Sequence, residues 1–307
     1  MKVAIFGTGG IGGYFGGRLA AHGTDVTFIA RGAHLAAIKA DGLKVESALG
    51  NLHVQAKATD DPKSVGAVDY VLFCVKMYDI ESAAAAVKPL IGPDTTVVTT
   101  QNGVDGRERI APVLGERHVM GGVAQIAATI AAPGVIRHTG QLARIVFGDR
   151  GGKVSERAKA LETECRAAGI DALATDKIDV EIWQKFVFLA SIAGLASMTR
   201  RAMGVTNADP DLKALLVEAV AEVVAVARAK GVAMPGDAAD RVTQTIGAMP
   251  AGAKPSMLQD LERGNRIEVA GLSGKVAALG RELGVPTPVH RTIYACLKLY
   301  IAGAPKA

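Results

Sequence analysis

The pattern of hydrophobic and polar positions differs between the two halves of the chain. In the first half, short runs rich in Val, Ile, Leu, Phe, Tyr and Thr are bounded by Gly, Asp or Pro, which is typical of buried strands. These runs predict strands at residues 2–6, 25–30, 69–75 and 96–100. Because helical patterns alternate with them, we expect an α/β fold with a doubly wound parallel sheet and crossover helices.

The end of the first half has a different pattern. Residues 118–149 carry short strand-like runs that are broken at Ala132-Pro133-Gly134 and at Thr139-Gly140. Such breaks between apolar runs predict an antiparallel extension of the sheet. Residues 151–169 then show a helical pattern.

The second half is almost entirely helical in pattern from residue 177 onward. We therefore predict an α/β domain over residues 1–176 and an all-helical domain over residues 177–307. After Asp211, apolar residues recur at helical spacing and mark one wide buried face, with Leu212, Leu215, Leu216, Ala219, Val220, Val223, Val224 and Ala227 as its members.

A glycine motif follows the first predicted strand and precedes a helical pattern. Gly7 permits a tight turn, Gly9 lets the backbone approach a pyrophosphate, and Gly12 lets the helix pack close to the sheet. The pyrophosphate then lies at the positive helix N-terminus. The alternative is a turn without a ligand, but the strand and helix on either side favour a dinucleotide site formed by Gly7, Thr8, Gly9, Gly10, Ile11 and Gly12.

Arg31 indicates which dinucleotide is bound. A site for NAD places an acidic residue about 20 positions after the glycines, whereas the second predicted strand here ends in Ala30-Arg31-Gly32. A guanidinium suits a 2′-phosphate. We therefore favour NADP(H), with an ordinary solvated charge as the alternative for Arg31.

Composition excludes several classes of function. The chain has 307 residues, 49% of them hydrophobic and 21% charged, as expected for a soluble globular protein. A net charge of +5 without a dense basic tract gives no support for nucleic-acid binding. The longest charge-free apolar stretch, residues 186–199, is too short for a bilayer, so no membrane association is expected.

Cysteine and histidine positions indicate neither disulfides nor metal. The cysteines are Cys74, Cys165 and Cys296, which are too dispersed for a disulfide framework or a metal cluster. The six histidines show no ligand spacing. A reducing, cytoplasmic setting fits this pattern.

Polar residues that follow predicted strands are candidates for ligand contact, because doubly wound sheets bind ligands at that edge. Asn102 follows the strand at 96–100 and is suited to bind a nicotinamide ribose or a substrate, although Asn-Gly is also a common turn dipeptide. Lys76 follows the strand at 69–75 and either contacts a cofactor hydroxyl or is solvated.

The helical half supplies a candidate proton donor. Lys185 heads a strongly apolar helix, where desolvation lowers a lysine pKa and suits it to protonate a carbonyl oxygen. The alternative is that its amine extends to water. Ser256 to Gln259 has the pattern of a capping box that opens a helix carrying Glu268. A helix cap and a surface acid are the ordinary alternatives for Ser256 and Glu268.

Taken in order, these motifs resemble the ketopantoate reductase (2-dehydropantoate 2-reductase) family over nearly the whole chain. The motifs in this order indicate the family more specifically than any one motif does. The matching motifs are the Gly7 to Gly12 loop, Arg31, Val75-Lys76, Gln101-Asn102-Gly103, Pro133-Gly134 with Gly140, Trp183-x-Lys185, Ser256-Met257-x-x-Asp260 and Glu268.

The resemblance implies a Rossmann domain followed by a helical domain like that of 6-phosphogluconate dehydrogenase, with the active site in the cleft between them. It implies that Lys185 is the general acid and that Glu268 holds the substrate and tunes the lysine. Asn102 and Ser256 would make supporting contacts. The implied reaction is hydride transfer from NADPH to a small 2-oxo acid, in pantothenate synthesis for the typical members.

Three positions depart from the family pattern. Members specific for ketopantoate carry substrate-binding asparagines where this chain has Leu189, Ala193 and Met203. Loss of hydrogen-bonding partners reduces discrimination for a hydroxylated acid, so a different 2-oxo acid or carbonyl substrate is an alternative. As a hypothesis, Arg200 or Arg201 replaces the lost carboxylate contact, although a solvated helix end also favours cations.

Two further possibilities follow from the whole chain. A non-catalytic NADP(H)-binding sensor is an alternative of another class, although a sensor needs neither Lys185 nor Glu268. The apolar helices of the second half make a homodimer plausible.

Overall fold

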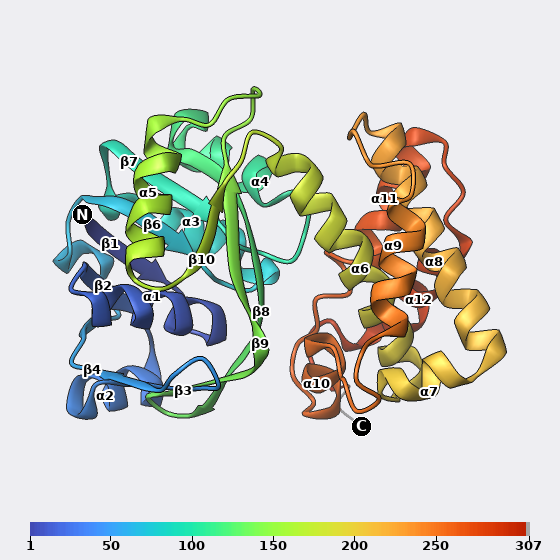
Figure 1. Cartoon of the computed structure of the whole chain (residues 1–307), viewed down its shortest axis with the longest axis horizontal. Helices are drawn as coiled ribbons and strands as arrows, with labels where there is room; N and C mark the ends of the chain where they lie inside the picture. Colours follow the sequence, from blue (N-terminus) through green and yellow to red (C-terminus); the bar gives the residue numbers. More distant parts are fainter. Residues whose placement is uncertain (305–307) are drawn as a thin grey trace. The chain divides into compact units, whose positions relative to one another are not determined.

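The computed structural model describes residues 1–304 and divides into two compact units (Figure 1). The first unit comprises Met1–Gln101 and Asp105–Ile178. The second begins at Asp179 and also includes the short segment Asn102–Val104. Three residues that lie shortly after strand β7 (Ile91–Thr99) of the first unit therefore belong with the helices of the second.

Parallel strands form the centre of the first unit in the order β8-β7-β6-β1-β2-β5. The strands predicted from the apolar runs are confirmed as β1, β2, β6 and β7. The bounds of the parallel strands are Lys2–Phe6 for β1, Asp25–Ile29 for β2, Lys57–Thr59 for β5, Val68–Phe73 for β6, Ile91–Thr99 for β7 and Val119–Ala132 for β8.

Strand β7 begins earlier than its apolar run indicated. Its pairing with β6 is irregular, because Ile91 pairs with Val68 whereas Thr96 pairs with Tyr70. The intervening residues, which include Pro93, bulge out of the ladder. Proline is tolerated at such irregular positions because it has no N–H to donate.

A long hairpin confirms the predicted antiparallel extension. Strand β8 turns at Pro133-Gly134 into β9, and β9 carries further strands on its other side. These are β9 at Val135–Gly148, β3 at Leu43–Ser47, β4 at Leu52–Val54 and β10 at Asp171–Ala174.

The predicted break at Thr139-Gly140 is wrong. Both residues lie inside β9, where the pairing steps from Ile126–Ala143 to Ala127–Thr139. Gly140 has a φ of +85°, which lets the extra residues leave the ladder as a bulge without ending the strand.

Helices cover the sheet, and α1 lies unusually close to it. A Cβ atom at Gly10 would lie 2.0 Å from the carbonyl oxygen of Ala128 in β8, and one at Gly12 would lie 2.3 Å from that of Gly7. Only glycine fits at both positions. The helices are α1 (Gly10–His22), α2 (Gly32–Asp41), α3 (Ile80–Ala86), α4 (Gly106–Leu114) and α5 (Glu156–Ala167), the last within the predicted segment 151–169.

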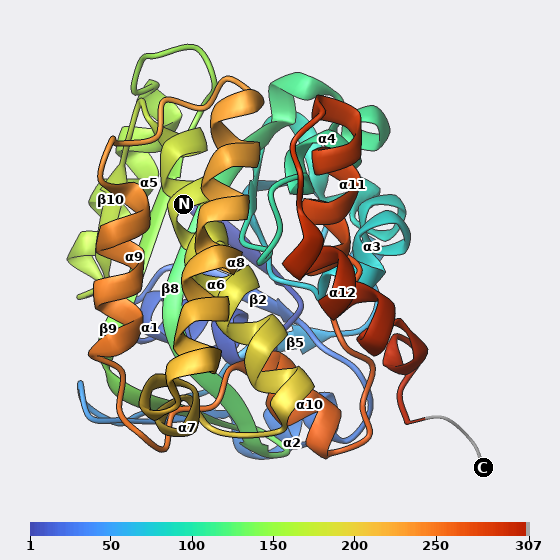
Figure 2. The same ribbon diagram turned by 90° about the vertical axis from the view of Figure 1, so that its right-hand side faces the viewer.

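The second unit is helical, as predicted, and α8 contacts α7, α9, α11 and α12 (Figure 2). Most of the predicted apolar face of α8 is buried, while Leu212 and Leu215 are partly exposed. The helices are α6 (Ile178–Thr199), α7 (Met203–Ala208), α8 (Pro210–Ala229), α9 (Ala238–Gly247), α10 (Ser256–Glu262), α11 (Ser273–Leu283) and α12 (Pro288–Leu297).

Helix α6 is longer than its charge-free stretch indicated. It has 22 residues, and among the described residues it is the one helix long and apolar enough to cross a membrane by length and composition. In its most apolar window, 61% of the residues are buried inside the protein. A core helix of a folded unit has this property, so the composition of α6 is weak support for a membrane span.

Candidate functional site

Three predicted residues, distant in sequence, meet in the second unit. The Lys185 Nζ donates a hydrogen bond of 2.8 Å to Asn102 Oδ1. Asn102 Nδ2 in turn donates one of 3.3 Å to Glu268 Oε2. The amide of Asn102 therefore bridges the amine and the carboxylate.

Each member of this Lys185–Asn102–Glu268 cluster comes from a different element. The expectation that Lys185 heads its helix is wrong, because α6 begins at Ile178 and Lys185 is its eighth residue. Asn102 follows the end of β7, and Glu268 lies between α10 and α11. The expectation that Glu268 is carried by the helix at Ser256 is wrong, because α10 ends at Glu262. Gly264, with a φ of +71°, follows in the left-handed conformation that commonly ends a helix.

The environment of Lys185 alters its proton affinity. Its side chain is partly buried, and Glu268 is only 6% exposed. Burial lowers the pKa of Lys185 to about 8, while the negative charge of Glu268 opposes this shift. An amine with such a pKa holds its proton at neutral pH and releases it more readily than an ordinary lysine, which suits a general acid.

Ser256 does not join this cluster. It is exposed, it is the first residue of α10, and Pro255 occupies the cap position before it. The predicted capping box is therefore wrong, because a residue already within the helix cannot act as its N-cap. In the described chain, Ser256 forms no hydrogen bond to Lys185, Asn102 or Glu268.

Gln101, which the sequence marks only as part of the motif Gln101-Asn102-Gly103, has a structural role. Its buried Nε2 donates to the carbonyl oxygens of Phe73, at 2.6 Å, and Val75, at 3.3 Å. These bonds fasten the end of β7 to the segment after β6 that leads into Lys76. In the sequence, this role is indicated by an amide side chain at the end of a strand, immediately before Asn102.

The glycine loop has the geometry expected of a phosphate cradle. Gly7 has a φ of +99°, and a Cβ there would meet the backbone of Cys74 at 3.0 Å. A Cβ at Gly9 would have no atom within 4 Å, so this side of the loop is open. Helix α1 begins without a side-chain cap, which leaves its first N–H groups available for an anion.

Thr8 ties this loop to β2. Its buried hydroxyl donates a hydrogen bond of 2.9 Å to the carbonyl oxygen of Ile29. Its backbone N–H donates to the same oxygen at 3.2 Å, so both donors of Thr8 are already engaged within the protein. Arg31 lies two residues beyond Ile29, is exposed and occupies the N-cap position immediately before α2. Over residues 1–304 its guanidinium has no hydrogen bond or ion pair within the protein.

The positions that depart from the family pattern lie on or after α6. Leu189 is partly buried and Ala193 fully buried. They follow Lys185 by about 6 and 12 Å along the helix axis, at 1.5 Å per residue. Met203 is fully buried in α7, and its backbone N–H donates to Ala253.

The hypothesis that Arg200 contacts the substrate carboxylate is wrong. Arg200 lies fifteen positions after Lys185, which is about 22 Å along the axis of α6. Its guanidinium instead lies 5.6 Å from the ring centre of Tyr300. A small 2-oxo acid at Lys185 is out of its reach, and Arg201, at the next position beyond the helix, is exposed.

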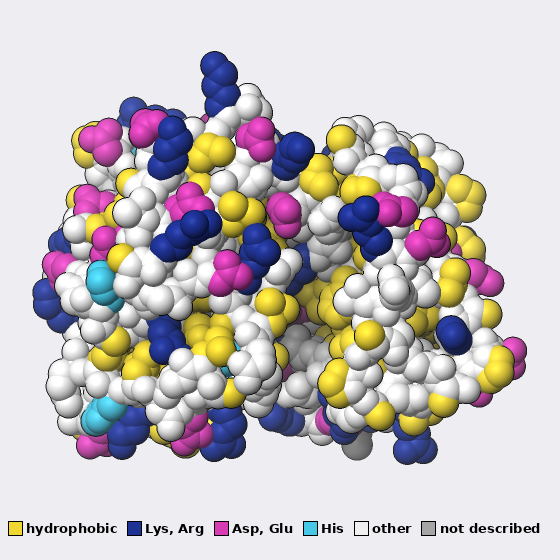
Figure 3. All heavy atoms as spheres, in the orientation of Figure 1, with side chains coloured by type: hydrophobic (Ala, Val, Ile, Leu, Met, Phe, Trp, Pro, Cys, Tyr) yellow, Lys and Arg dark blue, Asp and Glu magenta, His cyan; other side chains and the backbone are white. Residues whose placement is uncertain are grey.

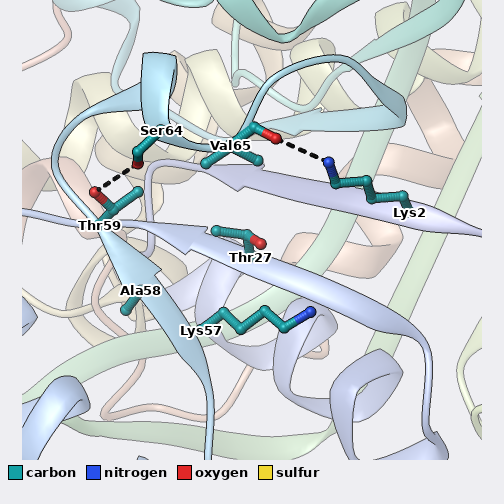
Figure 4. Close-up of a pocket in the computed structure, with 7 residues that line it drawn as sticks. All are labelled: Lys2, Thr27, Lys57, Ala58, Thr59, Ser64 and Val65. Atoms are coloured by element: carbon teal, nitrogen blue, oxygen red, sulfur yellow. Dashed lines mark hydrogen bonds between the residues drawn. The ribbon is translucent and has the colours of Figure 1, made fainter.

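A hollow of about 310 Å³ lies along β1, β2 and β5 (Figure 4). It contains none of the predicted site residues. Lys2 Nζ donates to the carbonyl oxygen of Val65, and Lys57 pairs with Asp25, so both amines that line it are already engaged. On the face of the protein shown in Figure 3, charged side chains of both signs are interspersed over the first unit.

Comparison with known proteins matches both units to one family. Residues 3–152 match the family model described as "Ketopantoate reductase PanE/ApbA". Residues 177–301 match the model described as "Ketopantoate reductase PanE/ApbA C terminal".

Individual relatives cover nearly the whole chain. A 2-dehydropantoate 2-reductase of Mesorhizobium japonicum is 35% identical over 97% of this chain and 97% of its own length. The uncharacterized oxidoreductase YkpB of Bacillus subtilis is 31% identical over 98% of this chain and 99% of its own length. The crystal structure of a PanE/ApbA family ketopantoate reductase from Ralstonia eutropha superimposes with a TM-score of 0.90, at 34% identity, over 98% of both chains.

Proposed function

Because the chain belongs to the ketopantoate reductase family, and is therefore an oxidoreductase acting on CH–OH groups, we propose that it reduces a small 2-oxo acid to a 2-hydroxy acid with NADPH. The observation that carries this proposal is the hydrogen-bonded Lys185–Asn102–Glu268 cluster. It unites a proton donor, a residue that holds it and a charge that stabilises its ammonium form.

Lys185 acts as the general acid. When bound, NADPH supplies the hydride that adds to the keto carbon. As negative charge develops on the keto oxygen, the ammonium of Lys185 donates a proton to it, which completes the hydroxyl group. Asn102 fixes the direction of the amine, and Glu268 offsets the effect of burial on its pKa.

The first unit supplies the residues suited to the cofactor. The open side of Gly9 and the uncapped start of α1 suit a pyrophosphate. The exposed guanidinium of Arg31 suits a 2′-phosphate and supports NADP(H) over NAD(H). Lys76, which follows the Val75 carbonyl that Gln101 binds, is the residue we propose for contact with a cofactor hydroxyl.

Ketopantoate is the first candidate substrate, because the Mesorhizobium relative is named for that reaction. A second candidate is a 2-oxo acid without a hydroxyl group. Leu189 and Ala193, which follow Lys185 along α6, offer such a hydroxyl no hydrogen bond. The relative YkpB is named only as an uncharacterized oxidoreductase, so it favours neither candidate substrate over the other.

A direct assay separates these candidates. NADPH consumption is followed by absorbance with a panel of 2-oxo acids that includes ketopantoate, 2-oxoisovalerate and phenylglyoxylate. We expect turnover that falls at least 100-fold in Lys185→Ala and is unchanged in Lys213→Ala, which removes an exposed lysine of α8. The preferred acid identifies the substrate.

The same assay tests the proposed function itself. Tight NADPH binding without lysine-dependent turnover of any panel member would favour the sensor alternative. Equal losses of turnover in Lys185→Ala and Lys213→Ala would show that Lys185 has no specific role in the reaction.

A cytoplasmic location and a homodimer complete the proposal. Val205 in α7 and Val217 in α8 are 48% and 44% exposed, and association through the helical unit would cover such apolar side chains. Sedimentation of the wild type beside Val217→Glu tests this association, since a charge in the interface should yield monomers.

A further inference from the structure

Arg109 joins the two segments that follow β6 and β7 in the first unit. It lies in the first turn of α4, which packs beside α3 (Figure 2). Its Nη2 donates a hydrogen bond of 2.8 Å to the carbonyl oxygen of Met77, the residue after Lys76. Its Nη1 lies 3.9 Å from Oδ1 of Asp105, the N-cap of α4. One guanidinium therefore contacts both segments at the edge where parallel sheets bind ligands.

The guanidinium is held in place by Glu81, in the first turn of α3. Its Nε and Nη2 donate hydrogen bonds of 2.7 and 2.8 Å to the two carboxylate oxygens of Glu81, which is a bidentate pair with a fixed direction. Only 25% of the Arg109 side chain is exposed. The hydrogen bonds to Arg109 lower the pKa of Glu81, so the pair stays charged at neutral pH.

Lys76 lies between two carbonyl groups that both accept hydrogen bonds from side chains. The Val75 carbonyl, immediately before it, accepts from Gln101 Nε2 at 3.3 Å. The Met77 carbonyl, immediately after it, accepts from Arg109. These two bonds hold the backbone on either side of Lys76, and they therefore set the position from which its side chain extends.

The shape of the guanidinium separates two roles of Arg109. Its planar fork donates in several fixed directions at once, so it binds both oxygens of Glu81 and the Met77 carbonyl together. An ammonium is a point charge without this geometry. A role limited to the ion pair between α3 and α4 would therefore tolerate lysine, whereas the bond to Met77 would be lost.

We propose that Arg109 is a positioning residue for the cofactor site: by binding the Met77 carbonyl, it holds the backbone from which Lys76 reaches the cofactor. Arg109 acts through Lys76 and needs no contact with the ligand. This inference rests on the proposed contact between Lys76 and a cofactor hydroxyl, and it adds a residue of α4 to the support of that contact.

The test is a double-mutant cycle on the dissociation constant of NADPH, measured by its fluorescence at neutral pH. We expect Arg109→Lys to bind about fivefold more weakly than wild type, the effect of one lost hydrogen bond, and Lys76→Ala about tenfold more weakly. The double variant should bind as Lys76→Ala does, because Arg109 has no amine to position once Lys76 is removed. Independent losses would multiply to about fiftyfold in the double variant, and that result would overturn the inference.

Arg166→Lys is the matched control, because Arg166 in α5 pairs with Glu162 and donates to the carbonyl oxygen of Ala172 in β10. It loses an equivalent bond away from Lys76, and it should bind NADPH as wild type does. Wild-type affinity in Arg109→Lys would overturn the inference, since the ion pair alone would then be sufficient. Absence of NADPH binding by wild type, or unchanged binding in Lys76→Ala, would instead contradict the proposed cofactor site on which the inference rests.

Hydrogen exchange tests the same bond without the cofactor. The backbone N–H of Asp79 donates a hydrogen bond of 3.0 Å to the carbonyl oxygen of Lys76, so its exchange rate reports local opening of this turn. We expect the Asp79 amide to exchange at least fivefold faster in Arg109→Lys than in wild type, with the amides of β1 unchanged. Arg109→Gln repeats this measurement if the lysine variant does not fold. Equal rates at Asp79 in variant and wild type would overturn the proposal.

Discussion

Replacing Glu268 with Gln should move the pH dependence of catalysis by an amount that the structure bounds. The hydrogen bonds of 2.8 and 3.3 Å on the two sides of the Asn102 amide allow the Lys185 amine and the Glu268 carboxylate to be at most about 8 Å apart. At an effective dielectric constant of about 20, two unit charges about 7 Å apart attract by about 2.4 kcal/mol. That energy corresponds to a pKa change of about 1.7.

The direction of the change follows from the role of Lys185 as an acid. The pKa of Lys185 is about 8 with Glu268 present and should fall to about 6 without its charge. Activity that needs the ammonium is present below this pKa and lost above it. The decline in kcat/KM with rising pH should therefore move from about pH 8 to about pH 6, which lowers activity about fivefold to tenfold at pH 7 through protonation alone.

The assay is the kcat/KM of the preferred 2-oxo acid from pH 5 to pH 9.5 at saturating NADPH. Glu282→Gln is the control, because Glu282 is an exposed acid of α11, and it should leave the profile unchanged. A Glu268→Gln profile that keeps the wild-type inflection, with only a lower plateau, would refute the electrostatic link between this carboxylate and Lys185.

Three further predictions concern the cofactor and the helical unit. Arg31→Ala should raise the KM for NADPH at least tenfold and leave the KM for NADH unchanged. Steady-state kinetics with both cofactors test this, and a variant that still prefers NADPH to NADH as strongly as wild type would contradict it. Gly9→Ala should fold normally but bind NADPH weakly, because its added methyl group lies in open space beside the glycine loop. Gly10→Ala should lower the melting temperature, because its added methyl group would lie 2.0 Å from a carbonyl oxygen. Equal melting temperatures of the two variants would argue against this packing. Glu222→Gln should lower the free energy of unfolding by about 1–3 kcal/mol, since this buried carboxylate accepts two backbone N–H groups at the start of α12; urea denaturation with an unchanged midpoint would show that these bonds are dispensable.

Local patterns were sufficient for most of the architecture. The apolar runs identified β1, β2, β6 and β7, and the glycines after β1 marked the start of α1. These features depend on side-chain periodicity and on backbone conformations within a few residues. Short strands such as β4 and β5, with three residues each, were missed because they contain too few positions to show a period.

Errors arose where one local signal had two structural uses. Gly140 was expected to interrupt a strand, but its positive φ forms a bulge inside β9. Ser256 has the residue type of an N-cap, yet Pro255 precedes the helix and takes that position. In both cases neighbouring strands or turns decided which use was realised, and a single sequence does not contain that information.

The sequence by itself thus determined the order of strands and helices, the glycine loop and the residue types available for proton transfer. Only the tertiary structure decided that Asn102 belongs with the second unit and joins Lys185 to Glu268, or that the imidazole of His34 accepts a hydrogen bond from the backbone N–H of Gly134. The physical reason is that periodicity reflects contacts within one element, whereas these groups meet across 83, 166 and 100 positions. Which distant side chains meet depends on how whole elements pack and where each connecting segment ends.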